Sequence, residues 1–255
     1  MRIATWNVNS VRARMANALE WLGAAKPDIV LLQEIKCETE AFPRLEFEAL
    51  GYHCHALGQK SYNGVAILSR LPIEDVREGL LGDAGDAQAR YLEALIGGVR
   101  IASLYVPNGN PVETEKFTYK LAWMERLRVH AAELLRREEA LVLGGDYNVI
   151  PEALDVYDPA AWEQDALFHP MARAAFRRLE ALGLTDIYRA LHPDKPHAYT
   201  FWDYQAGAWP QDHGLRIDHF LMSPEAVDRV RGCQIDRAPR GQDKASDHTP
   251  VVVEI

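Results

Sequence analysis

The 255-residue sequence has little cysteine, no long apolar run and no excess of basic charge. Its three cysteines, Cys37, Cys54 and Cys233, are too few and too irregularly spaced for a disulfide framework or a cysteine-held zinc site, and they suggest free thiols in a reducing compartment. No segment reaches the roughly 20 apolar residues needed to cross a bilayer. The N-terminus, MRIATWNVNSVRARM, lacks the apolar core of a signal peptide. We therefore expect a cytoplasmic protein with no secretion signal and no membrane contact.

Basic residues are outnumbered, since 28 Lys and Arg stand against 37 Asp and Glu, a net charge of −9. A protein that binds polyanions through charge alone usually carries a basic face, so this balance counts mildly against that class. The exclusion is weak, because a metal site itself requires carboxylates and local fields matter more than total charge. The length suits one large α/β domain or two small ones. We find no linker-like stretch and expect a single domain over residues 1–255.

Short β-rich runs recur along the chain, and each ends in polar residues. They cover residues 2–8, 28–34, 64–70, 99–106, 140–148, 216–223 and 250–255. Three other stretches have apolar residues at helical spacing, from Val11 to Leu22, from Phe117 to Leu134 and from Met171 to Leu182. Strands mixed with covering helices predict a layered α/β domain. A faint likeness of 2–8 to 216–223, and of 29–34 to 141–146, suggests two similar halves whose polar strand ends share a cleft.

Two long segments, 149–170 and 192–214, show no such periodicity. Structureless loops of this length are uncommon in compact domains and tend to be functional. The second contains five aromatic residues within eleven positions: Tyr199, Phe201, Trp202, Tyr204 and Trp209. They form either a small core of the loop itself or a surface for stacking bases and enclosing a sugar.

The segment LVLGGDYNVI, residues 141–150, ends an apolar strand with two glycines and then places Asp146 and Asn148 two positions apart. These residue types are usual in turns, which is one explanation of the stretch. Alternation along an extended chain also points both side chains to one side, which suits a shared catalytic task. Other strands end in polar residues too: Asn7, Asn9, Glu34, Tyr105, Asn108, Asp218, Asp247 and His248. Each of them, taken singly, could equally be a turn residue, a paired buried carboxylate or a packed core side chain.

Taken together, these residues suit the metal-assisted hydrolysis of a phosphate ester. Mg²⁺ prefers oxygen ligands and keeps most of its water, so one or two carboxylates and an amide oxygen suffice to hold it. Glu34, Asn7 and Asp247 offer such a set, and no cysteine–histidine set favours zinc.

The remaining polar residues suit the other tasks of that reaction. Asp146 is the candidate to orient or deprotonate the attacking water, and Asn148 to hold a phosphate oxygen or position Asp146. A histidine backed by a carboxylate can stay protonated and stabilise charge on phosphoryl oxygens, as His248 with Asp218 could. Tyr105 could donate its hydroxyl to a phosphate oxygen.

Eight short motifs strengthen this hypothesis. TWNVNSVRAR, IVLLQEIKC, YNGVAILSR, LYVPNGN, LGGDYNVIPEALDVYDP, YTFWDY, GLRIDHFLMS and SDHTPVVVEI occur along the whole chain. In order and approximate spacing they resemble the exonuclease III family of Mg²⁺-dependent abasic-site (AP) endonucleases, within the endonuclease/exonuclease/phosphatase superfamily. The resemblance implies an α/β fold of DNase I-like type, a four-layer sandwich of two packed mixed β-sheets flanked by helices.

The resemblance also implies an activity and a set of site residues. The activity is hydrolysis of the phosphodiester 5′ to an abasic site in duplex DNA, together with 3′-to-5′ exonuclease and 3′-phosphatase action, by a monomer that uses Mg²⁺ or alternatively Mn²⁺. The implied metal site comprises Asn7, Glu34, Asp146, Asn148, Asp247 and His248. The implied catalytic residues are Tyr105, Asp146, Asn148, Asp218 and His248. The implied DNA contacts are Asn9, Arg12, Lys36, Asn108, Lys116, Phe201, Trp202, Leu215 and Ile217.

Two positions depart from the pattern of some relatives. Asn9 stands where some members carry an aspartate, which leaves its role near the metal open, and Leu215 stands where some carry a bulky aromatic residue. Phe201, Leu215 and Ile217 would form the apolar pocket for a base-less sugar, so the pocket would have a different shape here.

Two alternatives stay open. One is another branch of the superfamily, a DNase I-like nuclease or a lipid- or inositol-phosphate phosphatase, although Tyr105 stands where those branches generally place a histidine. The other is a nucleic-acid-binding relative without catalysis, which would need a basic stripe. Candidates for that stripe are Arg12, Arg14, Lys36, Lys60, Lys116, Lys120, Arg237, Arg240 and Lys244.

Overall fold

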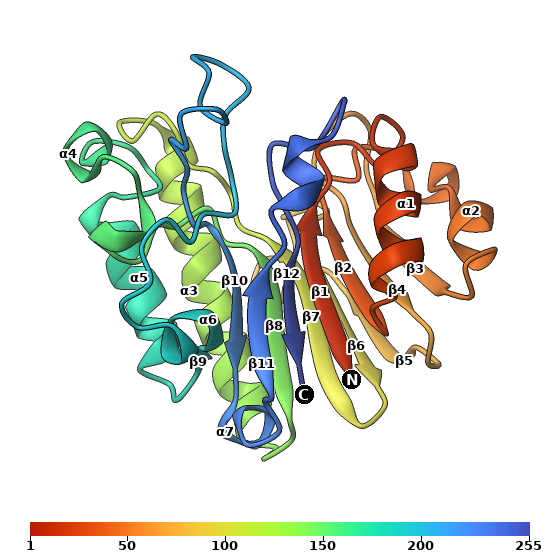
Figure 1. The fold of residues 1–255 in the computed structure, drawn as a ribbon. Coiled ribbons are helices and arrows are strands. Elements are labelled where there is room, and N and C mark those ends of the chain that lie inside the picture. The colour runs from red at the N-terminus through yellow and green to blue at the C-terminus, as the bar shows by residue number, and fades with distance from the viewer.

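The computed structural model describes residues 1–255 as two six-stranded β-sheets packed face to face, with helices on both outer sides (Figure 1). The first sheet has the strand order β11-β12-β1-β2-β4-β3. Its strands are β1 (Arg2–Asn7), β2 (Ile29–Gln33), β3 (His53–Leu57), β4 (Val65–Ser69), β11 (Gly232–Ile235) and β12 (Val251–Glu254). The second sheet has the order β5-β6-β7-β8-β10-β9. Its strands are β5 (Glu74–Glu78), β6 (Tyr91–Ile96), β7 (Val99–Tyr105), β8 (Leu141–Asp146), β9 (Thr185–Asp186) and β10 (Asp218–Met222).

Helices complete the outer two layers. The first sheet is covered by α1 (Met15–Ala25) and α2 (Arg44–Glu48), and the second by α3 (Glu115–Leu135) and α5 (Pro170–Glu180). Shorter helical segments are α4 (Pro159–Trp162), α6 (Ile187–Leu191), α7 (Pro224–Val227) and the 3₁₀ turns η1 (Thr39–Ala41), η2 (Ala153–Asp155) and η3 (Ala238–Gly241). The predicted four-layer α/β sandwich is confirmed. No helix combines the length and the apolar character that a membrane crossing requires.

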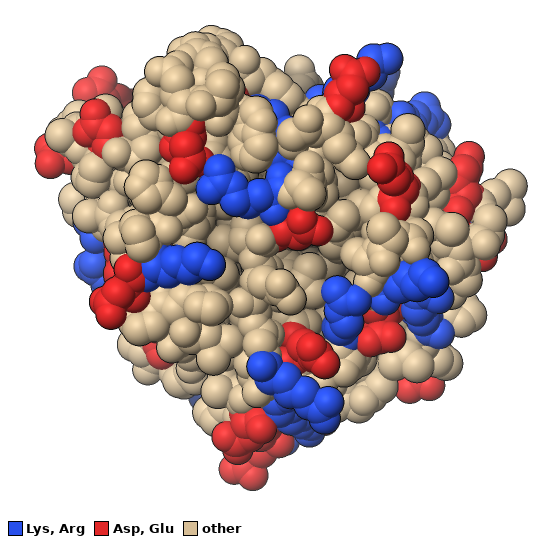
Figure 2. Space-filling model, in the orientation of Figure 1, with Lys and Arg blue, Asp and Glu red and all other residues tan.

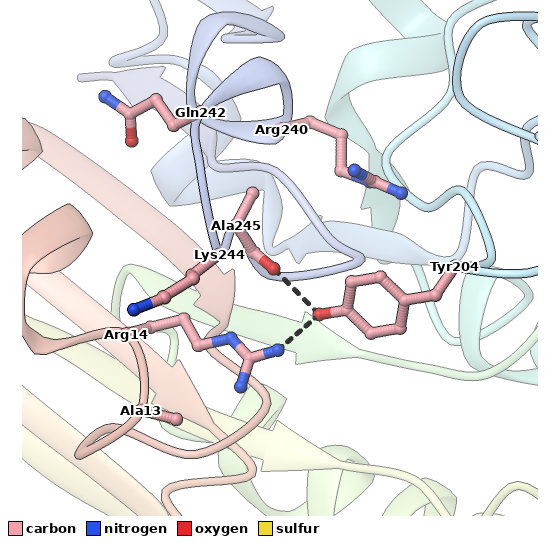
Figure 3. A pocket seen from close by; sticks show the side chains of 7 residues that line it. All are labelled: Ala13, Arg14, Tyr204, Arg240, Gln242, Lys244 and Ala245. Atoms are coloured by element: carbon pink, nitrogen blue, oxygen red, sulfur yellow. Dashed lines mark hydrogen bonds between the residues drawn. The ribbon is translucent and has the colours of Figure 1, made fainter.

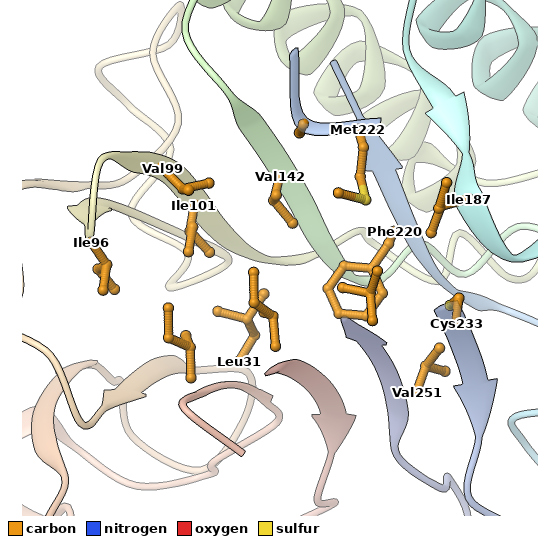
Figure 4. Close-up of a cluster of buried hydrophobic side chains, with 14 of the residues drawn as sticks. Leu31, Ile96, Val99, Ile101, Val142, Ile187, Phe220, Met222, Cys233 and Val251 are labelled. Carbon is orange, nitrogen blue, oxygen red and sulfur yellow. The ribbon is translucent and has the colours of Figure 1, made fainter. Parts of the chain in front are cut away.

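The core between the sheets is built by side chains from the inner face of each central strand. Leu31, Ile101, Val142 and Phe220 meet there, all without exposed surface or nearly so (Figure 4). The alternate residues of the same strands pack under the helices in two further apolar clusters. Strands that are buried on both faces read as continuous apolar runs, which is why the sequence revealed them.

Each sheet contains one parallel pair, β1 with β2 and β7 with β8, among otherwise antiparallel neighbours. Strand β1 lies against β8 across the interface, and β2 lies against β7. Parallel strands end at the same sheet edge, so the ends of these four strands meet at one end of the core. The chain termini lie side by side at the opposite end (Figure 1).

The predicted likeness of the two halves is present in the order of the strands but not in the pairs proposed from the sequence. Reading outward from the parallel pair, β1 corresponds to β8, β2 to β7 and β12 to β10. The sequence comparison instead matched β1 with β10 and β2 with β8. That match is wrong, because it rested on similar amino-acid sequences. Two strands are equivalent when they hold the same place in their sheets and pair with their neighbours in the same directions.

Candidate active site

The backbone itself marks the strand ends as unusual. Glu34, directly after β2, has φ +50°, and Asn148, two residues after β8, has φ +48°. Left-handed backbone is costly for residues other than glycine and persists only where the surroundings enforce it. The loop after β1 does so at Glu34, whose carbonyl accepts the N–H of Ser10 at 2.8 Å. These two polar side chains are thus held in fixed positions at the edges of the two sheets.

Three side chains that are far apart in the sequence converge here. Potential ligand atoms of Glu34, Asp146 and His248 all lie within 4.8 Å of one another. The Asn7 amide nitrogen donates to Glu34 Oε1 at 2.8 Å and to Asp146 Oδ2 at 3.0 Å, and Lys36 Nζ lies 2.8 Å from Glu34 Oε2. Burial alone would raise the pKa of Glu34, but the Lys36 charge and the Asn7 hydrogen bond outweigh it and lower that pKa. An ionised carboxylate beside a second one fits a hard divalent cation.

Asn7 is at the predicted place, with its oxygen turned away from the carboxylates. Its Oδ1 accepts the N–H of Asn9 at 3.0 Å, while its nitrogen faces Glu34 and Asp146. Which end of an amide is oxygen follows from such partners. Asn7 therefore acts as the hydrogen-bond bridge between the two carboxylates, and its role as a metal ligand stays a prediction.

Asp146, in the segment LVLGGDYNVI, takes part both in a turn and in the cluster. Its Oδ1 accepts the backbone N–H of Asn148 at 2.9 Å, so the turn exists, and the same carboxylate belongs to the cluster with Glu34 and His248. Burial raises the pKa of Asp146; the charge of His248 opposes the shift, and the charges of Asp218 and Glu34 add to it. A raised pKa suits a group that exchanges a proton near neutral pH.

His248 is paired as the sequence predicted. Its Nδ1 lies 2.9 Å from Asp218 Oδ2, and its Nε2 lies 3.8 Å from Asp146 Oδ2. Burial opposes protonation, but Asp218, with Asp146 and Asp247, raises the pKa of His248 to about 10. The paired imidazole suits the predicted contact with phosphate, and the predicted role of His248 as a metal ligand stays a prediction.

Asn148 and Asn108 form a small amide pair beside the carboxylates. Asn148 Nδ2 donates to the carbonyl of Val106 at 2.9 Å, and its Oδ1 accepts from Asn108 Nδ2 at 3.3 Å. The Asn148 backbone, and not its side chain, holds Asp146. Tyr105 closes this side; burial, with the nearby charges of Glu34 and Asp146, raises its pKa well above the usual value, so its hydroxyl keeps its proton.

Asp247 and Asn9 lie at the rim of the cluster. The Asn9 amide nitrogen donates to Asp247 Oδ1 at 3.1 Å, and its oxygen accepts from Lys36. Asp247 is half-buried and stands outside the tight group of three. Asn9 thus ties Asp247 to Lys36, where an aspartate would have added a charge.

The predicted DNA contacts divide into three groups. Arg12 and Lys116 are exposed, Lys36 is half-buried beside Glu34, and all three stay predictions. Phe201 is half-buried, with its ring 5.0 Å from the His248 ring. Leu215 and Ile217, at 1% and 2% exposure, are closed into an apolar cluster behind Phe201, so they support this ring and do not themselves line an open pocket.

The prediction that Trp202 contacts DNA is wrong. Its side chain is fully buried, packs with Tyr199, Ala208 and Trp209, and donates its indole N–H to Asp212 at 3.0 Å. The aromatic loop therefore has a small core of its own, and Tyr204 is its exposed aromatic residue. The count of aromatic residues could not distinguish the two roles, because both require the same side chains.

Lys120 is a residue that the sequence analysis misplaced. It was a candidate for the basic stripe, yet it is fully buried and donates to the carbonyls of Asn108 (3.0 Å), Asn148 (2.5 Å) and Ala166 (3.1 Å). Burial lowers its pKa to about 7, opposed by Asp146 and Asp165. It ties α3 to both amide loops of the site. A signal existed, since Lys120 lies three residues after Phe117 and four before Met124 on the apolar face of α3.

The site combines two clustered carboxylates, a histidine paired with a third carboxylate, and neutral hydroxyl and amide donors at the edges of two packed sheets. This set of groups defines a class, a metal-dependent hydrolase of phosphate esters. The Endonuclease/Exonuclease/phosphatase family matches residues 4–248 of the chain. Exodeoxyribonuclease III of Haemophilus influenzae is 32% identical over 100% of this chain and 99% of its own. The chain therefore belongs to the endonuclease/exonuclease/phosphatase family.

Solved structures agree. An AP endonuclease from Archaeoglobus fulgidus is 39% identical, with a TM-score of 0.95 over 99% of this chain and 98% of its own. The 3′ phosphatase NExo from Neisseria, bound to a product DNA hairpin, is 38% identical, with a TM-score of 0.97 over 100% of this chain and 99% of its own. The predicted family, fold and enzyme class, a hydrolase of the DNA repair nuclease type, are confirmed.

Proposed function

We propose that this enzyme hydrolyses the phosphodiester 5′ to an abasic site in duplex DNA, leaving a 3′-hydroxyl and a 5′ sugar phosphate. The same site would remove nucleotides and phosphates from 3′ ends. The observation that carries this proposal is the convergence of Glu34, Asp146 and His248, with Asp218 behind the histidine. The names of the relatives, an exodeoxyribonuclease, an AP endonuclease and a 3′ phosphatase, support DNA as the substrate.

The oxygen ligands of the cluster suit Mg²⁺, with Mn²⁺ as the alternative. Glu34 and Asp146 would hold the ion, with Asp247 at the rim. When bound, it would neutralise charge on the phosphate and lower the pKa of a coordinated water.

The chain's own groups account for the remaining chemistry. Attack by water breaks the bond between phosphorus and the 3′ oxygen, which leaves with a proton. Asp146, which lies within 4.8 Å of His248 and Glu34, takes a proton from the water or delivers one to the leaving oxygen. Protonated His248 donates to a phosphoryl oxygen and stabilises its charge, as the neutral Tyr105 hydroxyl and the Asn148 amide do beside it.

The proposal includes the state of the molecule. Residues 1–255 would act as a single domain and as a monomer, because one chain supplies every group of the cluster from both sheets. The cytoplasmic location stays a prediction.

The test compares three duplexes, one with a stable abasic analogue, one with a recessed 3′ end and one with a 3′-phosphate. We expect cleavage 5′ to the abasic analogue, its loss in EDTA and its return with excess Mg²⁺. Faster turnover of an inositol phosphate or of a lipid headgroup phosphodiester than of abasic DNA would overturn the proposal. Binding to DNA in EDTA with no cleavage on addition of Mg²⁺ would instead favour a relative without catalysis.

A further inference from the structure

A cavity of about 370 Å³ opens beside the candidate active site (Figure 3). Its wall carries three cationic side chains, Arg14, Arg240 and Lys244, together with the ring of Tyr204, and no carboxylate. The chain as a whole is acidic, with a net charge of −9, and acidic and basic side chains are interspersed on the face shown in Figure 2. Three cations without an acid are therefore a local exception that favours an anionic ligand.

The arginines are held in place around Tyr204. Its hydroxyl accepts from Arg14 Nη2 at 2.7 Å and donates to the Ala245 carbonyl at 2.8 Å (Figure 3). The guanidinium carbon atoms of Arg14 and Arg240 lie 5.8 and 5.4 Å from the ring centroid. These contacts join the loop after β1, the aromatic loop and the segment after η3, so a ligand would meet a preformed wall.

Both arginines keep unused donors. Arg240 is only 8% exposed; its Nη2 donates to the Trp202 carbonyl at 3.0 Å, but its Nε has no partner. The buried Nε of Arg14 has none either. A buried donor without an acceptor costs free energy. Both Nε atoms are closed off from solvent, so an anion in the cavity would meet the outer Nη atoms of the two guanidinium groups.

The cavity is close to the catalytic cluster. The Tyr204 hydroxyl lies 3.4 Å from Asn9 Nδ2, and the same nitrogen donates to Asp247 at 3.1 Å. Phosphates follow one another along a DNA strand every roughly 3.4 Å of helix axis. A strand with one phosphate at His248 therefore brings others to this wall.

We propose that this cavity is a subsite for one backbone phosphate of the substrate DNA, separate from the phosphate that is cleaved. The guanidinium fork matches phosphate oxygens in pairs, and Lys244 adds a point charge. Such a contact would place the DNA without reading its sequence. The inference rests on the proposed function, since it presupposes a DNA substrate.

The first test measures binding of the abasic duplex in EDTA as a function of salt. K244Q should reduce the slope of log K against log salt by about 1, the change expected for one lost phosphate contact. K26Q is the matched control, because Lys244 and Lys26 are both exposed and both have left-handed backbone, with φ +51° and +47° respectively. Cleavage at saturating DNA should stay within a few-fold of the wild type for K26Q.

The second test locates the phosphate. Single methylphosphonate replacements along each strand should reveal one position, other than the cleaved one, where neutralisation weakens binding by the wild type more than binding by K244Q. Equal slopes for K244Q and K26Q, or no such position, would refute the subsite. If the wild type itself neither binds nor cleaves abasic DNA, the proposed function fails; if it does both and K244Q behaves as K26Q, the subsite alone fails.

Discussion

At the scale of single residues, Asp146 carries the clearest prediction. It is 1% exposed, and D146N preserves its shape while removing its capacity to exchange a proton. We expect the single-turnover incision rate to fall on the order of 10² to 10⁴, the range for a positioned acid or base, while DNA affinity in EDTA largely survives. Incision within a few-fold of the wild-type rate would remove Asp146 from the mechanism.

Asp218 acts through His248. The pair at 2.9 Å raises the pKa of His248 to about 10 against burial, so D218N should lower that pKa. Below the lowered pKa the variant should cleave, whereas above it the rate should fall on the order of 10², as for a lost charge-stabilising donor. A pH–rate profile checks this, with the exposed D228N as control. If the rate of D218N fell at the same alkaline pH as the rate of the wild type, Asp218 would not set the pKa of His248.

At the scale of elements, strand β8 positions Asp146 through its glycines. A Cβ on Gly145 would lie 1.9 Å from the Leu104 carbonyl oxygen of β7, and backbone cannot rotate away. G145A should therefore destabilise the protein by about 1–3 kcal/mol and slow incision, because β8 must shift. G232A, with no atom within 4 Å of its added carbon, should stay within about 0.5 kcal/mol. Urea unfolding measures the loss of stability in both variants. Similar losses for G145A and G232A would refute a role for the close contact between Gly145 and Leu104.

The strands that the sequence analysis missed show what periodicity cannot reveal. Strand β5, EDVRE, is an almost fully exposed edge, and β6, YLEALI, consists largely of residues that also suit a helix. Pairing with β5 and β7 makes β6 a strand. By contrast, the expected helices were found because their apolar faces repeat over several turns, although Met171 of α5 is 53% exposed and does not belong to the buried face.

At the scale of the whole molecule, a buried neutral histidine links stability to pH. His219 Nε2 lies 2.9 Å from the Val149 carbonyl and Nδ1 lies 3.0 Å from Arg216 Nη1; burial, with the Arg216 charge, lowers its pKa to about 4. Between pH 6.5 and 4 the unfolded chain binds a proton that the folded chain does not, so stability rises with pH in this window. From pH 6.5 down to 5 the contribution of His219 to stability should fall by about 1–2 kcal/mol, whereas Asp146, with its raised pKa, acts in the opposite direction.

The measurement is the free energy of unfolding in urea at several pH values. H219Q should remove the His219 contribution, so its stability should rise less with pH between 5 and 6.5 than that of the wild type, whatever its stability at pH 7. H53Q, an exposed histidine, should leave the slope unchanged. A slope for H219Q equal to that of the wild type would assign the pH dependence to other groups.

The sequence by itself determined the layers and the membership of the site. Central strands are apolar on both faces and helices on one, so burial leaves a periodic pattern, and the motif order indicated the family. The positions of five site residues followed from the strand ends. Asn7, Glu34 and Asp146 lie where parallel strands end, and Asp218 and His248 lie where the antiparallel neighbours β10 and β12 begin, at the same edge. Their roles did not all follow, since a role depends on the partner that each atom meets.

Only the tertiary structure decided those partners. It turned the Asn7 nitrogen toward the carboxylates, placed Trp202 inside its loop and buried Lys120 under three carbonyls. It also brought Arg14 to Arg240 and Lys244 around one cavity, although Arg14 lies more than 200 positions before the other two in the sequence. Periodicity reports which side of an element is buried. Which polar atom faces which, across two sheets and four loops, is decided by packing over long sequence distances, and no local pattern records it.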